Sequence, residues 1–217
     1  MSTHGNTARA GRWTRAGARR TAVAASVLVA AAGVSSCTAG GVTGPASVAM
    51  SEETSGPVYL GVTDDTVQHR LEDRYRSAFE AAGREVEARD VTTGDRLDKL
   101  HNGEVSVVIG CVGELLDELD PAKGEELRGL YAEAQEEGAD ASQWRDIAHS
   151  TMFSALPTDL QASDPGEVAA CDDDSLPQNF VAVYRKTALD RPDRRALNNV
   201  AGGVSDDDLA EESSDSS

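Results

Sequence analysis

Between residues 57 and 110, short apolar runs alternate with segments of helical periodicity, and this alternation constrains the fold more than any other feature of the chain. The sequences PVYLGV at 57–62, REVEARDV at 84–91 and VSVVIG at 105–110 have the length and composition of strands. Between them, apolar residues recur every three or four positions, as in helices that bury one face. Short joints between these elements predict a parallel βαβαβ unit and an α/β fold.

Local signals mark where the first two helices begin and end. Thr63, Asp64 and Asp65 supply a cap and acid for the first helix, and Gly83 supplies its end. The second helix is shorter and is predicted to begin at Thr93.

The rest of the chain adds helices and one further strand. Residues 115–156 have helical spacing throughout, whereas residues 158–178 are typical of a loop and show no strand pattern. NFVAVYR at 179–185 predicts another strand. A helix opened by Pro192 and a last short helix capped by Ser205 follow it.

The N-terminal segment has the composition of a secretory signal. Residues 1–20 contain five arginines and no acidic residue, and residues 21–34 form an uncharged run rich in Ala and Val. That run is shorter than the stretch of about 20 residues that spans a bilayer. We therefore expect residues 1–36 to be removed on export; Arg19-Arg20 leaves the twin-arginine route open beside the general secretory one.

The remaining chain is strongly acidic. The formal charge is −18, and loss of the five signal arginines makes it −23. This balance argues against binding to nucleic acid and against a basic patch for anionic lipid. We expect a flexible tether at 37–56, one domain at 57–210 and a disordered acidic tail at 211–217.

Motifs of enzymes and metal sites are absent from the sequence after residue 36. It contains no Gly-x-Ser-x-Gly, no His-Glu-x-x-His and no phosphate-binding loop. Its three histidines occupy polar positions of predicted helices, and its cysteines lack the spacing of metal ligands. We therefore expect neither an enzyme nor a bound metal or cofactor.

Ligand contacts are predicted at the turns that follow the first three strands. In open parallel sheets, ligands lie beyond the carboxyl ends of the strands, so these turns should meet at one edge. Asp64 and Asp65 suit a cation, and Thr93 with the amides near Gly94 suits a carboxylate. The alternative is that Thr63, Asp64 and Thr93 are only helix caps. The predicted ligand-binding residues are Thr63, Asp64, Asp65, Thr92, Thr93, Gly94, Cys111 and Gly113.

The sequence Val34-Ser35-Ser36-Cys37 resembles the lipobox of bacterial lipoproteins, in which two small residues separate an aliphatic residue from a cysteine. The resemblance implies that Cys37 receives a lipid and becomes the first residue of the mature chain. The alternative is an ordinary signal with a chance cysteine. Because two cysteines then remain in an oxidising compartment, we predict a Cys111–Cys171 disulfide; a reactive Cys111 or two buried thiols are the alternatives.

Two segments resemble the substrate-binding lipoproteins of glycine betaine/choline-type (osmoprotectant) ABC importers. Residues 58–116 share a strand–Gly start, a long helix ending in Ala-Ala-Gly, a Thr-Thr-Gly helix start and an Asn-Gly-Glu turn before the third strand. Residues 179–211 are similar to the closing segment of the family, with an ALN-type helix, a Gly and a Ser-Asp helix start.

The resemblance implies a type II periplasmic-binding-protein fold. The first lobe would comprise residues 57–113 and 179–210, and residues 114–178 would form a reduced, mainly helical second lobe. The family cages a quaternary ammonium with aromatic rings. Here only eight aromatic residues follow Cys37, and Tyr75, Phe79 and Phe180 are expected in the core.

From this resemblance we expect a lipid-anchored protein on the extracytoplasmic face of the cell membrane. It would deliver a small cationic or zwitterionic solute, betaine- or choline-like, to the permease of an ABC importer. The alternative is a degenerate relative that acts in the cell envelope as an interaction or sensing lipoprotein.

Overall fold

The computed structural model describes residues 56–215, and side chains as far as residue 210. The predicted signal at 1–36, the lipidation site Cys37 and the tether up to residue 55 lie outside the described residues.

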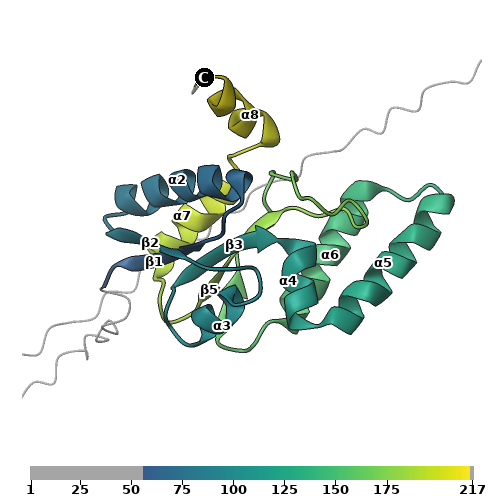
Figure 1. The fold of residues 1–217 in the computed structure, drawn as a ribbon, viewed down its shortest axis with the longest axis horizontal. Coiled ribbons are helices and arrows are strands. Elements are labelled where there is room, and N and C mark those ends of the chain that lie inside the picture. The colour runs from purple at the N-terminus through teal and green to yellow at the C-terminus, as the bar shows by residue number, and fades with distance from the viewer. Residues whose placement is uncertain (1–55, 216–217) are drawn as a thin grey trace, which may run out of the picture. The chain divides into compact units, whose positions relative to one another are not determined.

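A five-stranded mixed sheet forms the centre of the fold, in the order β2-β1-β3-β5-β4 (Figure 1). Its strands are β1 (Val58–Val62), β2 (Val86–Asp90), β3 (Val107–Cys111), β4 (Leu160–Ala162) and β5 (Phe180–Arg185). β1 pairs in parallel with both β2 and β3, which confirms the predicted parallel unit. β5 is antiparallel to β3, and β4 is antiparallel to β5. The protein is therefore a mixed α/β fold.

Seven helices accompany the sheet in the described part of the chain. They are α2 (Thr66–Ala81), α3 (Arg96–His101), α4 (Val112–Leu119), α5 (Pro121–Glu136), α6 (Ala141–Ala155), α7 (Arg191–Ala201) and α8 (Asp206–Asp215). The side chain of Asp65 caps α2 by accepting a hydrogen bond from the backbone N–H of Gln68 at 2.7 Å. After α2, Gly83 has a φ of 87°, which a residue without a Cβ adopts at no steric cost.

One face of the sheet is covered by α2 and α7 (Figure 1). Alternate residues of β1, β3 and β5 point to this face, as the period of two in a strand requires. Leu71, Tyr75 and Phe79 of α2 pack there beside Leu197 of α7. Tyr75 and Phe79 are thus core residues, as expected.

The opposite face is covered by α3 and by the helical segment α4–α6. Val108 of β3 and Val181 of β5 share a core with Leu116 of α4, Leu127 of α5 and Met152 of α6. Helices α4–α6, which belong to the segment 114–178 expected to form a reduced second lobe, thus share one hydrophobic core with the sheet.

Three local expectations need correction. The segment at 158–178 contains β4, whose three residues are too few to show a strand pattern in the sequence. The second helix begins at Arg96 and not at Thr93, because Asp95 accepts a hydrogen bond from the Thr92 amide and holds a turn there. The backbone of α8 continues to Asp215, past residue 211, where the tail was predicted to start.

The core packing predicts the effect of truncating a buried ring. Phe79 is 0% exposed beneath α2, whereas Phe153 on α6 is 43% exposed. We expect Phe79→Ala to lower the free energy of unfolding by about 3–5 kcal/mol, since it removes contacts and leaves a cavity. The matched control, Phe153→Ala, should cost less than about 1 kcal/mol. Urea unfolding of the purified chain measures both, and equal losses would contradict the assigned core.

Candidate functional site

A cavity of about 310 Å³ opens at the edge of the sheet where β1, β2 and β3 end. Its lining comes from residues 63–65 after β1, residues 91–93 after β2, and the junction of β3 with α4. Because β5 runs antiparallel to β3, it begins at this same edge, and Phe180 contributes to the lining. A wall is added by residues 170–172 of the loop before β5.

The cavity brings together six of the eight residues predicted to contact a ligand. They are Thr63, Asp64, Asp65, Thr92, Thr93 and Cys111. Gly94 lies in the exposed turn before α3 and is not part of the lining. Gly113 is also outside it, and its backbone N–H donates a hydrogen bond to Gln178 Oε1 at 2.6 Å. Whether the six residues touch a ligand stays a prediction.

Six further lining residues were missed by the sequence analysis: Gln68, Val91, Glu114, Ala170, Asp172 and Phe180. Two of them could have been predicted from the cysteine pairing. A bond between Cys171 and Cys111 brings Ala170 and Asp172, the neighbours of Cys171, to the end of β3. Glu114 follows Cys111 by three residues, one helical turn into α4. Nothing in the sequence predicted that the side chain of Gln68 is buried, because a polar residue in a helix is normally exposed.

Gln68 fixes one side of the cavity by joining two strand ends. Its side chain is 2% exposed, and its Oε1 accepts hydrogen bonds from the amide of Thr63 at 2.8 Å and from the Thr63 hydroxyl. Its Nε2 donates to the carbonyl of Ile109 in β3 at 2.6 Å. Because both the oxygen and the nitrogen of this buried side-chain amide are hydrogen-bonded, they favour one arrangement of Thr63 relative to Ile109. The turn after β1 is thereby held against β3.

Arg96 places a fully buried cation next to the cavity without lining it. Its Nε donates to Glu118 Oε1 at 2.8 Å, its Nη2 to Glu114 Oε2 at 3.1 Å, and its Nη1 to the carbonyl of Ile109 at 3.3 Å. A Cβ on Gly110 would collide with this guanidinium, so the glycine makes room for it. Every guanidinium nitrogen therefore has an acceptor inside the protein.

Carboxylates dominate the charge at the cavity. Asp64, Asp65, Glu114 and Asp172 line it, and no lysine or arginine of the described part of the chain does. Behind the lining, burial raises the pKa of Glu118, and the charge and hydrogen bonds of Arg96 oppose that rise. Arg96 pairs with Glu118 and with the lining carboxylate of Glu114, whereas the lining carboxylates of Asp64 and Asp172 have no ion pair with a described residue. Within residues 56–210, no group of three His, Cys, Asp or Glu side chains is placed to hold a metal ion.

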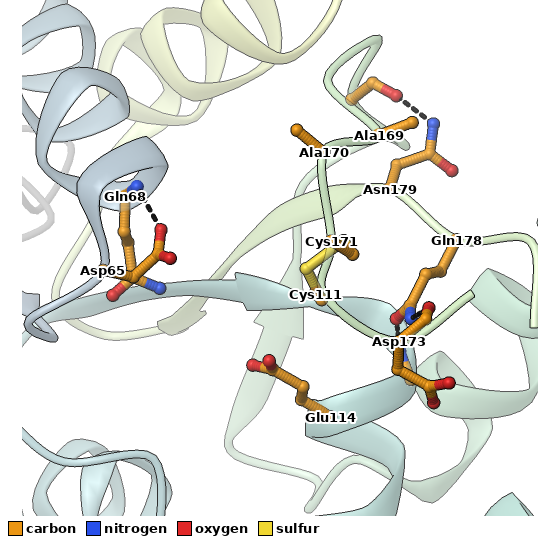
Figure 2. Close-up of a disulfide and its surroundings, with 12 residues drawn as sticks. Asp65, Gln68, Cys111, Glu114, Ala169, Ala170, Cys171, Asp173, Gln178 and Asn179 are labelled. Atoms are coloured by element: carbon orange, nitrogen blue, oxygen red, sulfur yellow. Dashed lines mark hydrogen bonds between the residues drawn. A yellow bond between two sulfur atoms is a disulfide. The ribbon is translucent and has the colours of Figure 1, made fainter. Parts of the chain in front are cut away.

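The loop before β5 is fastened to the cavity by the disulfide between Cys111 and Cys171, whose Cα atoms are 6.0 Å apart (Figure 2). This is the pairing predicted from the cysteine count. Asp206 of α8 also holds the loop, by accepting hydrogen bonds from the amides of Ala169 and Ala170 at 3.1 Å. Gln178 Nε2 donates to the carbonyl of Asp173 at 2.6 Å. The loop wall is therefore fixed at several points.

Loss of the disulfide should destabilise the protein. The bond closes a loop over a sequence separation of 60 residues, which in the chain-entropy model stabilises the folded state by roughly 4 kcal/mol. We expect Cys171→Ser to lower the free energy of unfolding by roughly that amount. Urea unfolding without reductant measures it, and Cys37→Ser, which leaves the pair intact, is the matched control. Equal stabilities for Cys171→Ser and the unchanged chain would contradict a stabilising disulfide.

Comparison of the chain with protein-family models, with curated proteins and with solved structures gave no match. What the protein does is therefore argued from its sequence motifs and from the geometry of the cavity.

Proposed function

We propose that the chain is a lipid-anchored, extracytoplasmic solute-binding protein that passes a small cationic or zwitterionic solute, betaine- or choline-like, to the permease of an ABC importer. The observation that carries the proposal is the cavity at the strand ends, which collects residues from three separate βα turns. Its volume of about 310 Å³ lies at the small end of the range for ligand pockets. The lining carboxylates favour a positively charged group in the solute.

Two features agree with the proposed location. The lipobox-like Val34-Ser35-Ser36-Cys37 supplies a site for the anchor. The Cys111–Cys171 disulfide fits a compartment that is oxidising. In residues 56–215, no helix combines the length and apolar character needed to cross a membrane.

A second candidate function is a cell-envelope interaction or sensing lipoprotein that no longer transports a solute. It is favoured by the packing of α4–α6 on the sheet, because such helices share a core with it and do not form a second jaw. It is also favoured by the aromatic content of the cavity, where Phe180 is the single ring among the described lining residues.

Titration calorimetry separates the two functions. The full chain, purified in detergent, would be titrated with choline, glycine betaine, carnitine, proline and 1,4-diaminobutane. The transport role predicts micromolar binding of at least one of them, because an importer needs a loaded carrier. Absence of binding across the panel would overturn that role and leave the interaction or sensing role.

The anchor has its own test. We expect the mature chain to begin at a diacylglyceryl-modified Cys37 and to fractionate with membranes. Cys37→Ser should lose both properties, because serine lacks the sulfur that receives the lipid. Whole-protein mass spectrometry and membrane fractionation measure the change, with Cys171→Ser as a cysteine variant that keeps the anchor. An unmodified Cys37 in the native protein would rule out the lipoprotein assignment.

A further inference from the structure

We infer that the cavity selects an organic cation with N–H donors at both ends, a small primary diamine, in preference to a zwitterion or a quaternary ammonium. The inference rests on the proposed function, since it takes the cavity to be a solute site, and it narrows the class of solute. It follows from the carboxylates that are free in the lining, from the hydrogen-bond donors that are already used, and from the number of aromatic rings.

The four lining carboxylates come from two sides of the cavity. Asp64 and Asp65 belong to the turn between β1 and α2, whereas Glu114 and Asp172 belong to the first turn of α4 and to the disulfide-bonded loop. Figure 2 shows Asp65 beside Gln68 at the left of the view and Glu114 apart from them, below the disulfide. Negative charge is therefore presented from both sides.

These carboxylates differ in whether they already make a hydrogen bond or an ion pair within the protein. Asp65 caps α2, and Glu114 accepts from Arg96. Asp64 and Asp172 are exposed and make no hydrogen bond or ion pair with any described residue. One uncommitted carboxylate thus stands on each side of the cavity. Two ammonium groups on one solute would match this arrangement, because each can form a charge-assisted hydrogen bond with a carboxylate.

Three backbone amides of the lining are unavailable to the carboxylate of a zwitterion. The amide of Thr63 is bonded to Gln68, that of Thr92 to Asp95, and that of Ala170 to Asp206. The nitrogens of Arg96 are all occupied as well. The carboxylate of a zwitterion would also be repelled by the four lining carboxylates, since no lysine or arginine among the described residues lines the cavity to compensate it.

A quaternary ammonium that enters the cavity would lose its hydration shell without finding the aromatic contacts that normally replace it. Such a cation has no N–H donor and is bound by the faces of several aromatic rings. Among the residues that the structure describes, Phe180 alone supplies a ring to the lining, and it is also part of the core over the sheet. A primary ammonium instead has three donors that oxygen ligands satisfy directly. The lining is rich in oxygen and poor in rings, which favours the primary amine.

The test is a calorimetric comparison on the full chain in detergent. We expect 1,4-diaminobutane to bind more tightly than n-butylamine, choline or glycine betaine, because only the diamine places an N–H cation on both sides. Asp64→Asn and Asp172→Asn should each weaken diamine binding by roughly three- to fivefold, the size expected for a partly exposed ion pair. Together they should weaken it by more than either alone. Neither carboxylate makes a hydrogen bond or ion pair with a described residue, and circular dichroism would check that both variants keep the fold.

The matched control is Glu133→Gln on α5, which removes the same charge from an exposed position away from the cavity. It should leave diamine affinity unchanged at moderate salt, since distant surface charges are screened. Tighter binding of choline or glycine betaine than of the diamine would overturn this inference and leave the proposed transport function intact. Equal weakening by Glu133→Gln and Asp64→Asn would also overturn it, because net charge and not the cavity would then govern binding. No binding of any compound would overturn both.

Discussion

The parallel pairing of β1 with β2 and with β3 is the constraint on which the rest of the structure depends. It aligns Val62 with Asp90 and Leu60 with Val107, so the turns that follow the three strands leave the sheet at the same edge. β5 runs the other way and therefore begins where its neighbour β3 ends. The cavity is a consequence of this arrangement, because strand ends that meet leave a space that no element fills.

Charge at this edge is divided between a buried and an open part. Arg96 is removed from water altogether, which is tolerated because Glu114, Glu118 and a backbone carbonyl satisfy it. Asp64 and Asp172 face the cavity without such a partner among the described residues. The buried ion pair thus stabilises the local structure, and the lining keeps a net negative charge.

The loop before β5 converts an open sheet edge into a walled site. Cys171 ties it to the end of β3, Asp206 holds its backbone from α8, and Gln178 joins it to the first turn of α4. Helices α4–α6 share a core with the other face of the sheet, and the wall of the cavity is built from this fastened loop.

The sequence by itself determined the first three strands and the turn at Gly83, and it predicted a helix cap within residues 63–65 and the pairing of Cys111 with Cys171, because each depends on local periodicity, capping geometry or a simple count. Only the tertiary structure decided that α4–α6 cover the sheet and that β4 joins it, since an apolar stripe does not specify what it packs against. It also decided the burial of Gln68 and Arg96, whose shared acceptor, the carbonyl of Ile109, is 41 and 13 residues away in the chain. Contacts over such separations leave no periodic trace, because they are chosen by how the finished elements fit together.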